Sequence, residues 1–252
     1  MTKKTESKQS FFGFQQVDEE NKKKMVEEIF DTVSSDYDLM NDILSLGAHR
    51  LWKRAAVNSC KLRPNYKVLD LAGGTGDMVK LMSSKVGKKG LIILSDINKK
   101  MLETGRDNII DKGINNVISV LLDAEELPFK ENSFDVISIA FGLRNLSNKQ
   151  RSLESVLHCL KPGGEFVILE FSKPTNDYIR ELYDLYSYEI LPKVGEIVAN
   201  SEESYRYLAE SIRMHPNQEE LLKLMQDTGY TSCQYENLSN GIVAIHKGIK
   251  PK

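Results

Sequence analysis

The stretch VLDLAGGTGDM, residues 68–78, decides the fold, because it joins a short buried strand to a helix through a turn rich in glycine. Glycine adopts backbone conformations and allows close approaches that a side chain would block. A glycine turn between a strand and a helix brings backbone N–H groups and the helix N-terminus beside a ligand. The sequence therefore predicts a ligand site directly after this strand.

Three kinds of nucleotide-binding turn compete for this arrangement. The phosphate-loop pattern G-x-x-x-x-G-K-[ST] is absent. The dinucleotide pattern G-x-G-x-x-G lacks its third glycine, because Val79 stands at that position. An acidic residue at the strand end followed by small residues is typical of S-adenosyl-L-methionine binding. This last version predicts methyl-donor contacts from Asp70, Gly74 and Gly76.

Acidic residues also end the next two predicted strands. Asp96 ends LIILSD, where a carboxylate can accept hydrogen bonds from both hydroxyls of a ligand ribose. Asp123 ends VISVLLD, where it can accept from an adenine amino group, and the backbone of Ala124 can pair with a ring nitrogen. A single aspartate after a strand is more often a helix cap. Together with the glycine turn, however, these residues favour donor binding.

The remainder of the chain predicts an α/β fold. From residue 66 onward, apolar runs alternate with amphipathic segments of helical length, which is typical of a parallel, doubly wound sheet. The runs are nearly continuous, so we expect helices on both faces of the sheet. Asn240-Gly241 between two alternating runs predicts a hairpin, so the sheet should end in an antiparallel pair.

Domain organisation is expected to be simple. We expect a flexible arm over residues 1–17 and a single domain over residues 18–252. Asp18 is predicted to cap a first helix, and a second helix is predicted over about residues 36–46. Helices within about residues 18–62 and an insertion over about residues 174–215 should form the acceptor side.

Composition excludes several classes of function. A formal net charge of −2 offers no electrostatic case for a nucleic-acid partner. Three scattered cysteines and four separated histidines predict neither a disulfide framework nor a metal site. The polar N-terminus lacks the apolar segment of a signal peptide, and no apolar run reaches the roughly 20 residues that span a bilayer. We therefore expect a cytoplasmic enzyme without a metal.

Several longer motifs resemble one family closely: DAEELPF, FGLRN, LKPGG, LEFSKP and ANSEESYRYLAESIRMHP, together with the glycine turn. This is the ubiquinone/menaquinone biosynthesis C-methyltransferase family, and the resemblance runs from about Gly13 to Lys247. It implies a class I, Rossmann-like methyltransferase with a seven-stranded sheet and S-adenosyl-L-methionine as the donor. By position, the resemblance implies donor contacts from Thr75, Asp96, Asp123 and Ala124. Ala140 departs from the serine common in this family, so its contact should come from the backbone or be lost.

The resemblance also implies the reaction. Bacterial members methylate a ring carbon of demethylmenaquinol and of 2-methoxy-6-polyprenyl-1,4-benzoquinol. A deprotonated hydroxyl makes that carbon electron-rich, and the enzyme mainly positions two reactants without a metal. Arg144 is expected to stabilise the phenolate and Asn145 to bond the other quinol oxygen. The alternative is that Arg144 caps the sheet edge or pairs with a nearby acid, and that Asn145 caps the following helix.

Contacts to the acceptor are expected from the N-terminal helices and the tyrosine-rich insertion. The candidates are Tyr37, Tyr205, Arg206 and Arg213. Three partner arrangements stay open, namely peripheral contact with the inner face of the membrane, a quinone-biosynthesis complex and a homodimer. A class I methyltransferase for another small-molecule acceptor is the alternative function. The sequence alone does not choose between benzoquinol and naphthoquinol.

Overall fold

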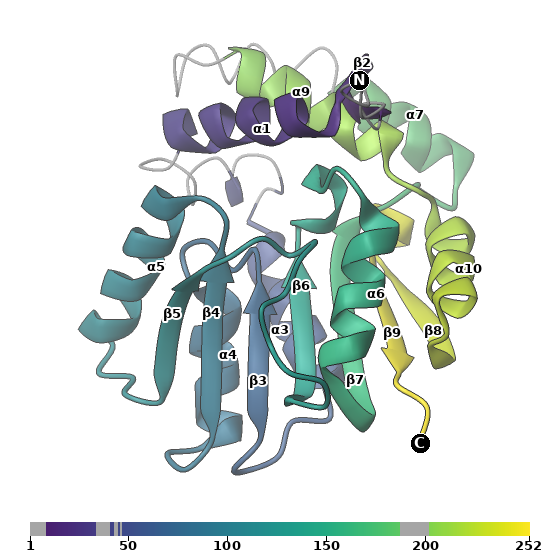
Figure 1. The fold of residues 1–252 in the computed structure, drawn as a ribbon. Coiled ribbons are helices and arrows are strands. Elements are labelled where there is room, and N and C mark those ends of the chain that lie inside the picture. The colour runs from purple at the N-terminus through teal and green to yellow at the C-terminus, as the bar shows by residue number, and fades with distance from the viewer. Residues whose placement is uncertain (1–8, 34–40, 43–44, 46, 187–201) are drawn as a thin grey trace, which may run out of the picture.

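The computed structural model describes residues 9–33, 41–42, 45, 47–186 and 202–252. Its centre is a seven-stranded sheet in the order β5-β4-β3-β6-β7-β9-β8 (Figure 1). The first five strands in this order are parallel, whereas β9 runs antiparallel to both of its neighbours. The strands are β3 (Lys67–Leu71), β4 (Leu91–Asp96), β5 (Val117–Leu121), β6 (Phe134–Ala140), β7 (Leu160–Phe171), β8 (Thr231–Leu238) and β9 (Val243–Ile249). The predicted parallel sheet with an antiparallel C-terminal pair is confirmed.

Helices cover both faces of the sheet because side chains alternate along each strand. In β3, Val68 packs into the core under α3, α4 and α5, whereas Leu69 packs into the core under α6 and α10. These helices are α3 (His49–Ser59), α4 (Asp77–Val86), α5 (Lys99–Asp111), α6 (Lys149–Cys159) and α10 (Gln218–Thr228). The edge strand β5 differs from the expected fully covered strands, since Ile118 and Leu121 are more than half exposed.

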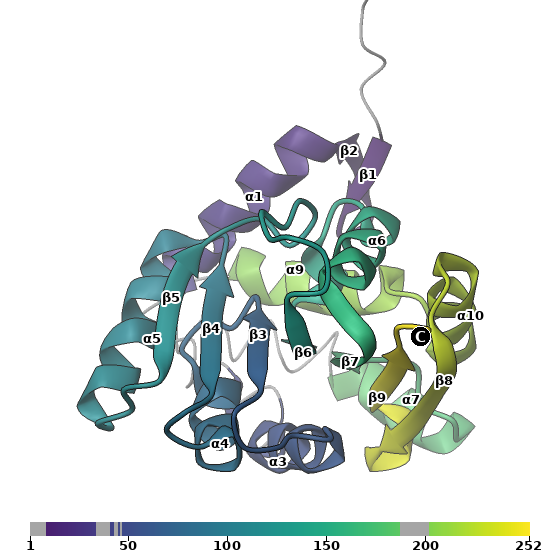
Figure 2. The ribbon, with the colours of Figure 1, turned by 60° about the horizontal axis from the view of Figure 1, so that its bottom comes forward.

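A further layer lies across the carboxyl ends of the parallel strands (Figures 1 and 2). It contains α1 (Glu19–Val33), α7 (Asp177–Leu185) and α9 (Glu202–Met214). Asp18 caps α1 as predicted, because its Oδ1 accepts a hydrogen bond from Asn21 N at 2.9 Å. Most of the helix predicted over residues 36–46 lies outside the described residues. In the part of the chain that the structure describes, no helix is both long and apolar enough to cross a membrane.

The structure differs from the expected flexible arm over residues 9–17. There β1 (Gln9–Phe12) and β2 (Gln15–Asp18) form an antiparallel hairpin. Phe12 is buried and stacks on Tyr207 of α9, with 4.2 Å between the ring centroids. This aromatic contact attaches the hairpin to α9 and explains why the segment is folded.

A glycine in the middle of α5 lets this helix approach the glycine turn. A Cβ atom built on Gly105 would lie 2.2 Å from the carbonyl oxygen of Gly74. Glycine within a helix costs about 1 kcal/mol relative to alanine. The close contact explains why glycine is nevertheless required here.

We expect Gly105→Ala to lower the free energy of unfolding by about 1–3 kcal/mol, because the new methyl group forces α5 away from the turn. Urea denaturation measures this change. The matched control is Thr104→Ala on the exposed side of the same helix, where we expect less than about 0.5 kcal/mol. If Gly105→Ala is as stable as the wild type, the close contact does not constrain the fold.

Candidate active site

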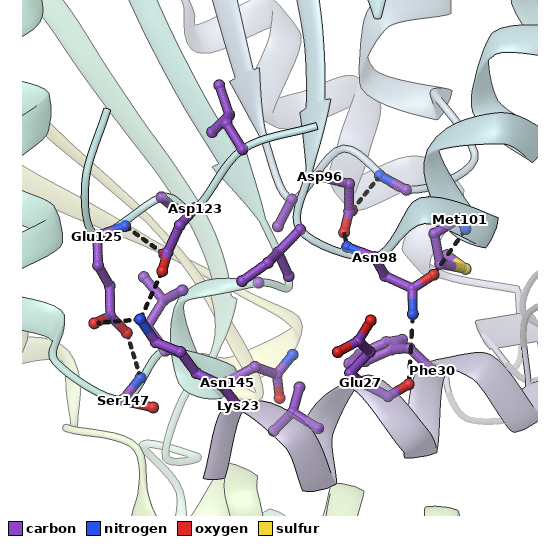
Figure 3. Close-up of a pocket in the computed structure, with 18 of the residues that line it drawn as sticks. Lys23, Glu27, Phe30, Asp96, Asn98, Met101, Asp123, Glu125, Asn145 and Ser147 are labelled. Carbon is purple, nitrogen blue, oxygen red and sulfur yellow. Dashed lines mark hydrogen bonds and ion pairs between the residues drawn. The ribbon is translucent and has the colours of Figure 1, made fainter. Parts of the chain in front are cut away.

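A pocket lies between α1 and the carboxyl ends of β3, β4, β5 and β6 (Figure 3). Strand order reverses between β3 and β6, and ligands of doubly wound sheets bind at such a point. The residues that line the pocket come from the strand ends and from one face of α1. They are Lys23, Val26, Glu27, Phe30, Ala72, Gly74, Asp96, Ile97, Asn98, Met101, Leu122, Asp123, Ala124, Glu125, Phe141, Gly142, Asn145, Leu146 and Ser147.

Two non-glycine residues in this pocket have left-handed backbone conformations. Ala72 follows β3 with φ of 47°, and Phe141 follows β6 with φ of 58°. Such conformations are uncommon outside glycine and cost about 1–3 kcal/mol each. A Cβ atom on Gly142 would lie 2.5 Å from Cβ of Ala72, so the turns after β3 and β6 are in direct contact. Strain of this kind is concentrated at functional sites.

Asp96 holds the donor side of the pocket together. Its Oδ2 accepts from Gly74 N at 3.0 Å, and its Oδ1 accepts from Asn98 N at 2.9 Å (Figure 3). Burial raises the pKa of Asp96 to about 6, although these backbone hydrogen bonds oppose the shift. The carboxylate predicted from the sequence is therefore at the pocket, bonded to the glycine turn.

Asp123 also lies at the pocket, where it pairs with α1. Lys23 Nζ is 2.6 Å from Asp123 Oδ2 and 3.4 Å from Glu125 Oε2. The other oxygen, Asp123 Oδ1, accepts from Glu125 N at 2.8 Å. Glu125 is itself buried, and its Oε1 accepts from the backbone N–H of Ser147 at 2.7 Å. The predicted contact residue Ala124 lies between these two acids and lines the pocket.

A second connection ties α1 to the end of β4. Asn98 caps α5, since its Oδ1 accepts from Met101 N at 2.9 Å. Its Nδ2 donates to Asp31 Oδ1 of α1 at 2.8 Å. Lys23 and Asp31 therefore attach α1 to two different strand ends and hold it over the pocket.

Four residues predicted as donor contacts are not among those that line the pocket. Asp70 is fully buried below the turn and accepts from Ser138 Oγ at 2.6 Å; burial raises its pKa to about 7. Thr75 is buried, and its carbonyl accepts from Asn108 Nδ2 at 3.1 Å. Gly76 is the N-cap residue of α4, with φ of 82°. Ala140 packs against the core under α3 and α4.

Arg144 is placed differently from its expected phenolate role. Its Nη1 lies 2.8 Å from Glu170 Oε1 and donates to the Phe141 carbonyl. The guanidinium carbon lies 5.4 Å from the centre of the Phe171 ring, a cation–π distance. Arg144 and Glu170 are both buried. The ion pair that was the alternative interpretation is therefore present, and Arg144 does not line the pocket.

Asn145 lies at the pocket, as expected for an acceptor contact. It does not cap the following helix, because Asn148 provides that cap by accepting from Arg151 N at 3.0 Å. Asn145 Oδ1 instead accepts from Tyr207 Oη at 3.1 Å. This bond leaves the amide Nδ2 of Asn145 as a donor available to a ligand. Burial raises the pKa of Tyr207 well above its usual value, so its hydroxyl stays protonated as the donor.

The predicted acceptor contacts are not brought together in the described structure. Tyr37 lies outside the described residues. Tyr205 is fully buried in the core, and Arg206 is exposed on α9. Arg213 lines a separate groove with Tyr183 and Arg180, and its Nη1 donates to the carbonyl of Ala209 at 3.1 Å.

Sequence reasoning missed several residues of the pocket. Three of them, Lys23, Glu27 and Phe30, lie on α1. They reach the pocket because α1 packs over the sheet, and no local sequence pattern predicts that packing. Asn98 follows Asp96 by two positions in an Asn-x-x-Met helix start, so its role as a cap was recognisable. Glu125 belongs to the quoted DAEELPF motif, but its hydrogen bond to the start of α6 is tertiary.

Comparison with known proteins identifies the family. A model of the ubiE/COQ5 methyltransferase family matches residues 16–250. The ubiquinone/menaquinone biosynthesis C-methyltransferase UbiE of Methylococcus capsulatus is 54% identical over 240 residues, which cover 95% of this chain and 97% of the relative. The UbiE protein of Idiomarina loihiensis is 52% identical over 240 residues, which cover 95% of this chain and 96% of the relative.

Solved structures show the same fold at lower identity. A SAM-dependent methyltransferase from Aquifex aeolicus matches with a TM-score of 0.60 at 18% identity, covering 84% of this chain and 98% of that protein. A Haloferax volcanii putative methyltransferase, solved with its Trm112 activator, matches with a TM-score of 0.66 at 16% identity, covering 90% and 98% respectively. With its pocket at the switch point of a class I methyltransferase sheet, the chain belongs to the ubiE/COQ5 methyltransferase family.

Proposed function

We propose that this enzyme methylates a ring carbon of polyprenylated quinols, namely demethylmenaquinol and 2-methoxy-6-polyprenyl-1,4-benzoquinol, in menaquinone and ubiquinone biosynthesis. The observation that carries this proposal is identity above 50% with UbiE relatives across 95% of the chain. The pocket supports it, because the acidic residues at the strand ends share one pocket with apolar side chains such as Phe30 and Phe141.

The donor end of the pocket fits S-adenosyl-L-methionine, which supplies an electrophilic methyl group when bound. Asp96 is a buried carboxylate already oriented by two backbone N–H groups, and it would accept from the ribose hydroxyls. Asp123 and the backbone of Ala124 would hold the adenine. Because Lys23 occupies Asp123 Oδ2, the adenine amino group would share this oxygen or replace the lysine.

At the acceptor end, we propose that Asn145 Nδ2 donates to a quinol oxygen while Tyr207 fixes the orientation of the amide. Arg144 is proposed as a positioning residue. Its ion pair with Glu170 fixes the turn that carries Asn145. In this role Arg144 does not contact the substrate itself. A polyprenylated acceptor partitions into a bilayer, so we also propose peripheral contact with a membrane surface.

The direct test is methyl transfer from methyl-labelled S-adenosyl-L-methionine to each short-tail quinol under reducing conditions. We expect label on the ring carbon, and a large loss of this label in Asn145→Ala with donor affinity unchanged. Donor binding without label on either quinol would leave the family assignment intact. It would favour another small-molecule acceptor.

Asp96→Asn should weaken donor binding roughly 10- to 100-fold, because a hydrogen bond to a charged group contributes about 1.5–3 kcal/mol. In the wild type, donor affinity should fall as the pH drops below about 6, because the carboxylate that accepts from the ribose becomes protonated. Calorimetry at several pH values measures both effects. Asp70→Asn is the control, since it removes the other buried carboxyl group of raised pKa and should retain the pH dependence. An equal pH dependence in Asp96→Asn contradicts the assignment.

Arg144→Ala should lower the free energy of unfolding by about 3–5 kcal/mol, because it leaves Glu170 buried without this cation. The double variant Arg144→Ala, Glu170→Gln should regain part of that stability, since an amide does not need a cation. If Arg144 is a positioning residue, methyl transfer should recover together with stability. A double variant that is stable and binds the donor but remains inactive would instead favour direct stabilisation of the phenolate.

A further inference from the structure

A second cavity, of about 190 Å³, lies beside the proposed active site and shares Ser147 with it. Its walls come from the β1–β2 hairpin, α1, the turn after β6, the start of α6 and the end of α9. The lining residues are Gln9, Ser10, Phe11, Gly13, Lys22, Arg144, Ser147, Lys149, Ser211 and Met214. Among these residues, the proposed methyl transfer uses only Arg144, as a positioning residue.

The charged side chains that line this cavity are all cationic. They include Lys22, Arg144 and Lys149 but no carboxylate. Lys22 is 3% exposed, and its Nζ donates to the carbonyl of Leu146 at 2.8 Å. In the described part of the chain, neither lysine has a carboxylate within ion-pair distance. Burial lowers the pKa of Lys22 to about 7, and the nearby charge of Lys149 adds to the shift. An anion in the cavity would relieve both effects.

Carboxylates that surround the cavity are engaged elsewhere. Glu170 pairs with Arg144 at 2.8 Å and acts on Lys149 only as a nearby charge, without an ion pair. Glu125 accepts from backbone N–H groups at the start of α6.

Two further acids lie near the hairpin and α1. Glu19 pairs with Arg151 at 3.4 Å. Glu210 accepts from the backbone N–H of Phe14 at 3.1 Å. Both acids are therefore occupied by donors outside the cavity.

Apolar side chains surround the opening. Phe11 is 45% exposed and Met214 is 40% exposed, and both line the cavity. Phe14 follows the lining residue Gly13 at the hairpin turn and is 52% exposed. Exposed aromatic and sulfur-containing side chains around a basic site are the combination that proteins use at an anionic membrane surface.

We propose that this cavity binds the phosphate of an anionic lipid headgroup, while Phe11, Phe14 and Met214 enter the membrane interface. Lys22 and Lys149 would contact the phosphate oxygens. The apolar rim favours a lipid over a free phosphate ion, which would leave these side chains in water. This inference rests on the proposed function only in that a polyprenylated acceptor is drawn from a bilayer.

The test is co-sedimentation of the full chain with phosphatidylcholine vesicles, with and without phosphatidylglycerol. We expect binding to require phosphatidylglycerol. Lys149→Gln should reduce the partition coefficient about fivefold, the factor expected for one basic residue at an anionic surface. The matched control is Lys89→Gln, which removes the same charge from an exposed position at the opposite end of β4. Phe14→Ser should reduce partitioning about tenfold, whereas Ile110→Ser, at an even more exposed apolar position on α5, should not.

Equal losses of vesicle partitioning in Lys149→Gln and Lys89→Gln would mean that binding depends on the overall charge and not on this cavity. That result would contradict the proposed site. Absence of any preference for phosphatidylglycerol overturns it as well. Inorganic phosphate that raises the melting temperature of the wild type, without vesicle binding, would assign a free anion and reject the lipid. Methyl transfer to a short-tail quinol without vesicles is measured separately. Failure of the lipid site and failure of the proposed function are therefore distinguishable.

Discussion

The hydrogen bonds of one carboxylate organise the proposed active site. Asp96 accepts from Gly74 in the glycine turn and from Asn98 at the start of α5, so it joins the ends of two neighbouring strands. Removing this carboxylate from water is unfavourable, and its raised pKa reflects that cost. The turn can approach it only because α5 carries Gly105 against the Gly74 carbonyl. The position of Asp96 and the glycines at positions 74 and 105 therefore depend on one another.

The N-terminal segment completes the site from a distance. Lys23 and Asp31, two turns apart on α1, bond to the ends of β5 and β4. The hairpin before α1 is attached in turn to α9 through Phe12 and Tyr207. Tyr207 also donates a hydrogen bond to Asn145. The hairpin is therefore linked through Tyr207 to the proposed acceptor contact. The pocket is thus covered by a helix, α1, that precedes β3, the first strand of the seven-stranded sheet.

The sheet and its helices could be predicted because apolar runs and amphipathic segments report burial locally. Asp96 and Asp123 could be predicted as well, because the carboxyl ends of parallel strands meet at one edge. The environment of Arg144 could not, since its partner Glu170 comes from the next strand along the chain and appears in no local pattern. The same holds for residues 9–17, where polar composition suggested an arm and the distant Tyr207 supplies the contact that orders Phe12. Strain at Ala72 and Phe141 is likewise invisible in a sequence, because neither residue type favours a positive φ.

Lys22 and Lys23 are neighbours on α1 but face different cavities, because successive residues of a helix point about 100° apart. Lys23 reaches the acids of the proposed active site, and Lys22 reaches the basic cavity under the hairpin. The single helix α1 therefore lines both cavities. Any ligand that tilts or shifts this helix on one side changes the free energy of occupancy on the other. By thermodynamic linkage, a ligand in the second cavity then changes the affinity of the first cavity by the same factor. The placement of two adjacent lysines therefore makes α1 a link between the proposed lipid site and the proposed active site.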